Sequence, residues 1–195
     1  MVNIKTMEKL LLTVILVTMN LFPSGCSQEI EWNNDLNKTE ADMSGYHYLQ
    51  DDHPAFEQIT LEESFRLFEN NQSGVVLYSR TSCDFCNAAV PILKEAAKDC
   101  NVKILYVDID DPAFISLPLS DQKELVDHLT ELVSSVLENN NLLIPLVVGV
   151  KNGKITGSYV GLTDSIKIKE YKDNDKAALN GMKRIYTTII HSVLK

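Results

Sequence analysis

The stretch VVLYSRTSCDFC (residues 75–86) carries the most informative pattern in the chain. Val75 to Tyr78 is a short apolar run of β-favouring residues, which predicts a buried strand. Two cysteines, Cys83 and Cys86, follow this run and open a segment that is predicted to be helical as far as residue 99. The sequence therefore places a CxxC pair where a buried strand passes into a helix.

Further strands and helices are predicted on both sides of this stretch. Thr60 and Glu63 form a capping box, and Asn152-Gly153 predicts a two-residue hairpin turn. Strands are expected at residues 102–109, 146–151 and 154–160, and helices at residues 60–70, 120–139 and 182–194. This order, βαβ followed by a helical crossover, a ββ hairpin and a final helix, predicts an α/β fold around a central mixed sheet.

The CxxC spacing points to thiol chemistry. Cys83 is expected near a helix N-terminus, where unpaired backbone N–H groups and the helix dipole stabilise a thiolate. Cys86 lies one turn further on, so a disulfide between the two can open and close without large backbone motion. This predicts Cys83 as the nucleophile that forms a mixed disulfide and Cys86 as the thiol that resolves it. Asp84 opposes the thiolate by like-charge repulsion, which favours a reducing protein.

Other interpretations of the cysteines stay open at this point. A structural zinc site needs four ligands, and neither Cys100 nor the four histidines shows ligand spacing, so we predict no metal. A metal-handling thiol protein is nevertheless one alternative hypothesis. A static disulfide across three residues is another, although so short a loop stabilises a fold little. Cys100 is predicted to be a buried apolar thiol.

Further landmarks, together with the CxxC pair, resemble the thioredoxin superfamily over roughly residues 60–195. Pro91, eight residues after Cys83, matches the proline that kinks the active-site helix of that family. Ile144-Pro145 resembles the family's cis-proline, which faces the CxxC pair and presents backbone to the substrate. The run from this proline to the Asn-Gly turn, and from the turn to Gly161, also has the family's spacing.

The resemblance implies a thioredoxin-like α/β fold, with residues 113–141 as a helical insertion before the cis-proline strand, and a protein-disulfide oxidoreductase. No bound cofactor is implied, because the electrons reside on the two sulfurs. Phe85 makes the motif similar to that of bacteriocin transport accessory proteins and other extracytoplasmic thioredoxin-like proteins. The resemblance implies two catalytic residues, Cys83 and Cys86, and four substrate-binding residues, Ile144, Pro145, Asp84 and Phe85.

Two positions depart from the family's pattern. Leu77 and Ser79 stand where thioredoxin has a buried aspartate and a tryptophan. Without that carboxylate, a proton acceptor for Cys86 is missing, which is expected to slow resolution. This departure and the long insertion support an alternative function: a non-enzymatic accessory or binding protein that keeps the fold and uses the insertion helix as an interface.

The N-terminus has the pattern of an export signal. Lys5 and Lys9 precede an apolar run over residues 10–22 that is short for a membrane span. The next four residues, ending at Cys26, resemble a bacterial lipoprotein signal, which predicts lipidation of Cys26, with ordinary secretion or an uncleaved anchor as the alternative. We therefore expect an extracytoplasmic protein, anchored to the cell membrane or secreted. Its domains are predicted as a signal (1–25), a polar tether (26–55) and a thioredoxin-like domain (56–195).

Charge and compartment together restrict the partners. The 195-residue chain has 18 Lys and Arg against 27 Asp and Glu, a net charge of −9, which argues against a nucleic-acid partner. The expected partners are cysteine-containing exported proteins or peptides, with a membrane electron donor or acceptor. The sequence leaves open whether the pair works as a reductase or as an oxidase or isomerase. Within the predicted tether, Trp32, Tyr46 and Tyr48 are expected either to dock locally on the domain or to be exposed.

Overall fold

The computed structural model describes residues 29–49 and 55–195. The predicted signal over residues 1–25 and the predicted lipidation of Cys26 lie outside the described residues. The elements, in chain order, are β1 (Thr39–Glu40), β2 (Phe56–Gln58), α2 (Leu61–Glu69), β3 (Gly74–Ser79), α3 (Asp84–Cys100), β4 (Ile104–Asp108), α4 (Pro112–Ile115), α5 (Leu119–Leu132), η1 (Ser134–Val136), β5 (Leu146–Lys151), β6 (Lys154–Val160), η2 (Tyr171–Asp173) and α6 (Lys176–Leu194).

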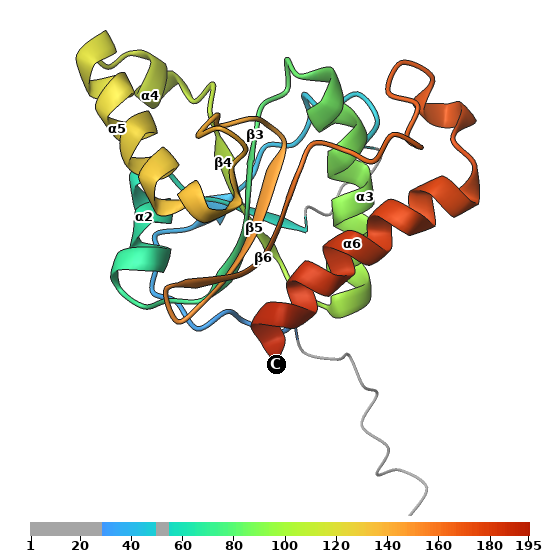
Figure 1. Cartoon of the computed structure of the whole chain (residues 1–195), viewed down its shortest axis with the longest axis horizontal. Coiled ribbons are helices and arrows are strands. Elements are labelled where there is room, and N and C mark those ends of the chain that lie inside the picture. The colour runs from blue at the N-terminus through green and yellow to red at the C-terminus, as the bar shows by residue number, and fades with distance from the viewer. Residues whose placement is uncertain (1–28, 50–54) are drawn as a thin grey trace, which may run out of the picture.

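Six strands form one mixed sheet in the order β1-β2-β4-β3-β5-β6. The neighbours β2, β4 and β3 are parallel, whereas β1, β5 and β6 run antiparallel to the strands they pair with. Helices α3 and α6 pack together over one face, and α2 and α5 contact each other over the other face (Figure 1). The predicted fold class, an α/β fold in which helices flank a central mixed sheet, is confirmed.

The central strands form the core because both of their faces are covered. All six residues of β3 are buried, as are most residues of β4 and β5. This explains why the three segments read as nearly continuous apolar runs rather than alternating ones. The edge strand β6 is only half-buried, and the predicted turn residues Asn152 and Gly153 both have positive φ, at 49° and 75°.

The predicted helix over residues 120–139 differs from what the structure shows. The α-helix ends at Leu132, because Val133 leaves helical geometry (φ −102°, ψ 10°) and the next turn is the 3-10 helix η1. Leu129 and Val133 are fully buried, whereas the rest of the apolar stripe is only partly covered. The insertion therefore lies at the edge of the domain, where it covers α2.

Residues 29–49 also differ from the polar tether that the composition predicts. Trp32 and Tyr46 are buried in the core, and the Trp32 indole N–H donates to the Lys103 carbonyl oxygen at 2.6 Å. Tyr48 is half-buried and stacks on Tyr171. The apolar side chains are spread along an irregular backbone without the hydrophobic period of a helix or a strand. No local sequence pattern therefore predicts their burial. Of the two alternatives, docking on the domain holds for the three aromatic residues, and Leu36, Ala41 and Met43 of the same segment are also buried.

The strands β1 and β2 were not predicted, because two or three residues are too short to show a period. In the part of the chain that the structure describes, none of the helices has the length and apolar character needed to cross a membrane.

Candidate active site

The CxxC pair stands at the start of α3, directly after the loop that leaves β3. Cys83 is the N-cap residue, and its Sγ accepts a hydrogen bond from the backbone N–H of Cys86 at 3.2 Å. Neither thiol is in a disulfide. Cys83 is half-buried and Cys86 is fully buried. One sulfur thus faces the surface at a helix N-terminus, where negative charge is stabilised, and the other lies beneath it.

The Ile144–Pro145 peptide bond is cis, as predicted. It precedes β5, which pairs antiparallel with β3, so the start of β5 lies beside the end of β3. This register brings the proline loop to the cysteines. The Sγ atom of Cys83 lies 4.0 Å from the carbonyl oxygen of Ile144. The structure therefore brings Cys83, Cys86, Ile144 and Pro145 together.

A cavity of about 690 Å³ opens next to this pair. Phe85 and Ile144 line it, whereas the other two predicted substrate-binding residues, Asp84 and Pro145, are not among its lining residues. Phe85 is 48% exposed, and Asp84 is exposed on the first turn of α3. The remaining lining residues come from η1, the loop before β5, and β6 and the residues after it: Val136, Glu138, Asn141, Leu143, Ser158, Tyr159, Val160, Gly161 and Leu162.

The two cysteines differ in their electrostatic surroundings. The pKa of Cys86 is raised to about 12, mainly by burial, and the hydrogen bond to Cys83 and the charge on Cys83 contribute to this rise. The Ser79 side chain and the Arg80 backbone act in the opposite direction, because they can donate hydrogen bonds to the Cys86 thiolate. Leu77 is fully buried, and its apolar side chain supplies no carboxylate here. Cys86 therefore holds its proton in the reduced protein.

A group of three buried hydroxyls lies below Cys86, and we name it the hydroxyl cluster: Ser79, Tyr46 and Tyr106. The Tyr46 Oη lies 2.8 Å from the Ser79 Oγ and donates a hydrogen bond to the Tyr106 Oη at 3.1 Å. Burial raises the pKa of both tyrosines. Sequence reasoning did not assign these residues to the site. The sequence gave two signals: Ser79 departs from the family's pattern, and Tyr46 is an isolated aromatic residue in a polar stretch.

Asn87 connects the N-terminal segment to the active-site loop. Its side-chain amide donates to the carbonyl oxygens of Thr81 (2.7 Å) and Cys83 (3.0 Å). Its Oδ1 accepts from the backbone N–H of His47 at 2.7 Å. Asn87 itself is buried on α3, and its three bonds are partly buried.

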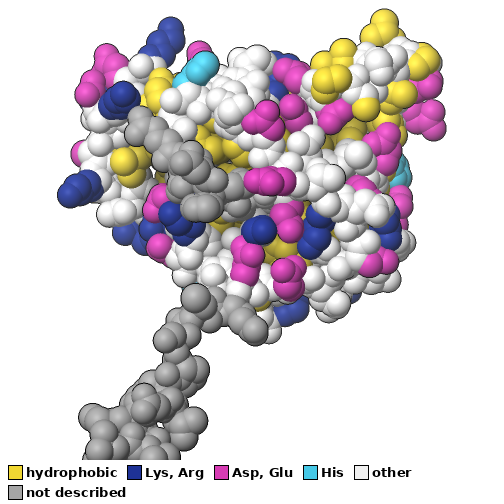
Figure 2. All heavy atoms as spheres, turned by 180° about the vertical axis from the view of Figure 1, so that it is seen from behind, with side chains coloured by type: hydrophobic (Ala, Val, Ile, Leu, Met, Phe, Trp, Pro, Cys, Tyr) yellow, Lys and Arg dark blue, Asp and Glu magenta, His cyan; other side chains and the backbone are white. Residues whose placement is uncertain are grey.

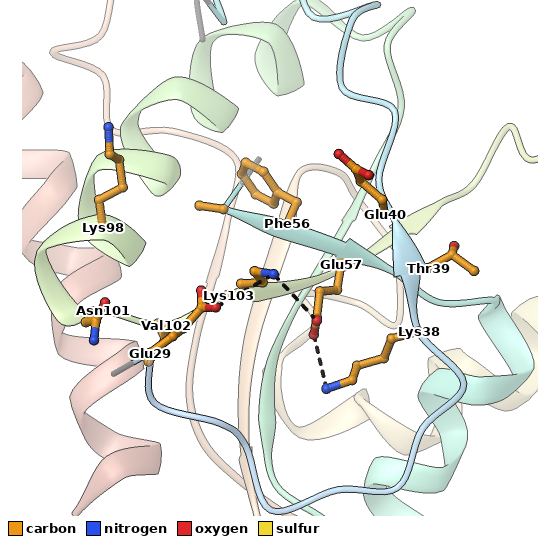
Figure 3. Close-up of a pocket in the computed structure, with 11 residues that line it drawn as sticks. Glu29, Lys38, Thr39, Glu40, Phe56, Glu57, Lys98, Asn101, Val102 and Lys103 are labelled. Atoms are coloured by element: carbon orange, nitrogen blue, oxygen red, sulfur yellow. Dashed lines mark ion pairs between the residues drawn. The ribbon is translucent and has the colours of Figure 1, made fainter. Parts of the chain in front are cut away.

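A second cavity of about 680 Å³ lies at the other end of the parallel strands, next to β1 and the start of β4 (Figure 3). Three of its charged side chains pair with one another: the Glu57 carboxylate lies 3.1 Å from the Lys38 Nζ and 3.9 Å from the Lys103 Nζ. Its lining residues include no cysteine. This cavity is therefore separate from the thiol site.

Cys100 lies at the far end of α3 from the CxxC pair. It is buried, as predicted, and burial raises the pKa of its thiol. Its Sγ lies 3.7 Å from the His191 Nε2. Across residues 29–49 and 55–195, no three or more His, Cys, Asp or Glu side chains are arranged to hold a metal ion.

Comparison with solved structures finds thioredoxins. A thioredoxin from Aeropyrum pernix is 22% identical, with 59% of this chain and 83% of that chain covered, at a TM-score of 0.36. A thioredoxin from Schistosoma mansoni is 18% identical, with 62% and 94% covered, at a TM-score of 0.34. No protein-family model and no curated protein matches the chain. Because both TM-scores are below 0.5, neither similarity says what this chain does.

Proposed function

We propose that the protein is a thiol–disulfide oxidoreductase that acts on cysteine-containing exported proteins or peptides through Cys83 and Cys86. One observation carries the proposal. The half-buried Cys83 sulfur caps a helix N-terminus beside the Ile144 carbonyl, and the Cys86 thiol is buried one turn behind it. Disulfide exchange needs an accessible sulfur that is stabilised as a thiolate, and a second thiol nearby that resolves the mixed disulfide.

The first step in the reducing direction is attack by the Cys83 thiolate on one sulfur of a substrate disulfide. A bond forms between the Cys83 Sγ and that sulfur, and the substrate's S–S bond breaks. The second substrate sulfur leaves with the electron pair and takes up a proton. The product is a mixed disulfide at Cys83, which lies beside the Ile144 carbonyl.

In the second step Cys86 loses its proton and attacks the Cys83 Sγ. The Cys83–Cys86 disulfide forms, the mixed disulfide breaks, and the proton lost by Cys86 is balanced by the one gained on the departing substrate sulfur. Two electrons have then passed from the protein to the substrate. The reverse sequence, starting from the Cys83–Cys86 disulfide, oxidises a dithiol substrate.

The timing of the two steps follows from the pKa of Cys86. The hydrogen bond to Cys83 and the charge on Cys83 both raise this pKa. Once the Cys83 sulfur is bound in a mixed disulfide it carries no charge, so the negative charge opposing Cys86 ionisation is removed. Cys86 therefore ionises more readily when it is needed, and it stays a protonated thiol before that.

We place this activity outside the cytoplasmic membrane, and the support is the sequence of residues 1–26 alone. A membrane donor or acceptor of electrons would then restore the pair after each cycle. The Asp84-Phe85 dipeptide makes exported peptides such as bacteriocin precursors a substrate class to test.

Insulin reduction with dithiothreitol as electron donor tests the proposal. We expect Cys83→Ser to abolish the activity and Cys86→Ser to stop it at a mixed disulfide that can be isolated by mass spectrometry. Cys100→Ala is the matched control and is expected to retain activity, since Cys100 lies at the far end of α3. Full activity of Cys83→Ser contradicts the proposal.

A second candidate, a binding protein that needs no thiol chemistry, is supported by the insertion. Hydrophobic side chains gather at the corner formed by α4 and α5 (Figure 2), where Ile115 is 52% and Leu119 is 82% exposed. On this hypothesis the Cys83→Ser/Cys86→Ser variant still complements a deletion strain, and Leu119→Asp does not. Loss of complementation by the double cysteine variant refutes it.

A further inference from the structure

The hydroxyl cluster extends the active site into the N-terminal segment. Ser79 ends β3, Tyr106 belongs to β4, and Tyr46 comes from the segment that precedes the α/β unit. Ser79 and Tyr46 are buried, at 0% and 1% exposed, so that no bulk water competes for their hydroxyls. Ser79 lies close enough to the Cys86 sulfur for its side chain to lower the pKa of that thiol. The hydroxyl cluster thus extends from beside that sulfur to a residue outside the predicted domain.

Contacts on both sides of Tyr46 hold it against the active-site loop. A Cβ atom added to Gly45 would lie 2.6 Å from the Thr81 Cγ2, so only glycine allows this approach. On the other side, the backbone N–H of His47 is bound by the buried Asn87 side chain. Both contacts involve residues close to Cys83. Thr81 lies in the active-site loop, and the Asn87 amide donates a hydrogen bond to the Cys83 carbonyl oxygen.

The Tyr46 hydroxyl has one proton, which it can donate either to the Tyr106 oxygen or to the Ser79 oxygen. In the reduced protein it is donated to Tyr106, so Ser79 is the donor in the contact between Ser79 and Tyr46. A Cys86 thiolate needs the Ser79 proton instead. If the Ser79 hydroxyl rotates to donate to the Cys86 sulfur, its oxygen can accept a hydrogen bond from the Tyr46 hydroxyl. Tyr46 then no longer donates to Tyr106. These changes are rotations of hydroxyl groups and need no backbone motion.

We propose that Tyr46 is a positioning residue for the resolving step, donating to Ser79 so that Ser79 donates to the Cys86 thiolate. This inference rests on the proposed function. In it, hydroxyl groups have the role that a buried carboxylate would otherwise have. The cluster accepts no net proton. The proton that leaves Cys86 is balanced by protonation of the departing substrate sulfur, and the cluster stabilises the thiolate between those events.

Several titratable groups face Cys86 from the elements around it. Cys83 lies on the same helix, Tyr46 on the N-terminal segment, Tyr106 on β4 and Tyr186 on α6. Asp108, half-buried at the end of β4, acts electrostatically on Tyr46 and Tyr106. Tyr186 is fully buried and its hydroxyl has no hydrogen-bond partner, so it holds its own proton. Among these groups, Tyr46 is the one in hydrogen-bond contact with Ser79.

The two steps can be separated with one equivalent of Ellman's reagent and stopped-flow absorbance. Attack by Cys83 releases a first thionitrobenzoate, and attack by Cys86 on the mixed disulfide releases a second. The first phase tests the proposed function and the second tests this inference, so failure of either is recognised separately. The Cys83→Ser/Cys86→Ser variant reports what Cys26 and Cys100 contribute, and that signal is subtracted.

We expect Tyr46→Phe to slow the second phase about tenfold at neutral pH, with its pH midpoint raised by about one unit. Ser79→Ala is expected to slow this phase at least as much, and the double variant no more than Ser79→Ala alone. Tyr106→Phe, which leaves the Tyr46 proton free for Ser79, is expected not to slow it. Tyr78→Phe is the matched control, because its buried hydroxyl bonds Ser64 and lies outside the cluster.

The inference is overturned if Tyr46→Phe leaves the rate and pH midpoint of the second phase as in the wild type. It is also overturned if Tyr78→Phe slows that phase as much as Tyr46→Phe does, because loss of packing around a buried phenol would then explain both. Equal slowing by Tyr106→Phe would refute the switch of the Tyr46 proton between two acceptors.

Discussion

The backbone N–H of His47 donates a hydrogen bond to the Oδ1 of Asn87 across 2.7 Å. His47 lies in the segment expected to be a tether, and Asn87 lies on the first turns of the active-site helix α3. The bond is partly buried, and without it the buried Asn87 side chain would lose the partner of its Oδ1. The N-terminal segment is therefore part of the structure that holds the CxxC loop.

Replacing Asn87 by Ala removes three partly buried hydrogen bonds at once and leaves the His47 N–H and the carbonyl oxygens of Thr81 and Cys83 without these partners. We expect the free energy of unfolding to fall by about 2–4 kcal/mol, at about 1–3 kcal/mol for each group left unsatisfied and with partial relaxation. Urea denaturation measures this loss. Asn174→Ala is the matched control, since Asn174 also makes three such bonds but in a partly exposed loop. An equal loss in both variants would contradict the account.

Gly45 is required by its approach to Thr81. In Gly45→Val the new Cβ would lie 2.6 Å from the Thr81 Cγ2, so the N-terminal segment or the active-site loop must shift. We expect a loss of about 1–3 kcal/mol in stability and slower reaction of Cys83 with disulfides. The control is Gly181→Ala on α6, where an added Cβ meets nothing within 4 Å. Wild-type stability of Gly45→Val would show that the contact is not needed.

The cavity beside the cysteines is expected to bind apolar side chains of the substrate. Phe85 and Leu143 line it and are 48% and 56% exposed. Truncating either to Ala should raise KM for a protein disulfide about tenfold, from a loss of about 1–2 kcal/mol, and leave the rate with a small aromatic disulfide unchanged. Leu119→Ala, outside the cavity, serves as control. An unchanged KM in both cavity variants would place the substrate elsewhere.

Buried tyrosines make the fold sensitive to alkali. Burial raises the pKa of Tyr78 and of Tyr186, so the folded protein keeps phenol protons that the unfolded chain, titrating near pH 10, has already lost. Stability from these groups is fully present below that pH and falls as pH rises, by about 1.4 kcal/mol per pH unit and group. Urea unfolding between pH 8 and 11 measures the slope. Tyr78→Phe should reduce it, and a flat profile would refute the assignment.

The sequence predicts the α/β unit well because its strands and helices have strong local signals. Thr60 caps α2 as predicted, and its Oγ1 accepts from the Glu63 N–H at 3.1 Å. The apolar runs around β3, β4 and β5 end within two residues of the predicted bounds. The juxtaposition of Cys83 with Ile144 was also predicted, from a family resemblance and not from local pattern.

The N-terminal part of the site could not be predicted in the same way. Tyr46 reaches Ser79 through a contact that spans 33 residues, and nothing in the intervening sequence encodes it. Gly45 gives no sign that it faces Thr81, because a close approach depends on the folded partner. Composition described residues 29–49 as polar, whereas a few spaced apolar side chains decide their burial.

A redox titration of the full chain in glutathione buffers tests the central claim most directly. After acid quenching and alkylation, peptide mass spectrometry reports whether Cys83 and Cys86 are free or joined. The account predicts one reversible two-electron transition in which the two thiols are lost together as a Cys83–Cys86 disulfide. Cysteines that stay separately alkylated in fully oxidised buffer would contradict it.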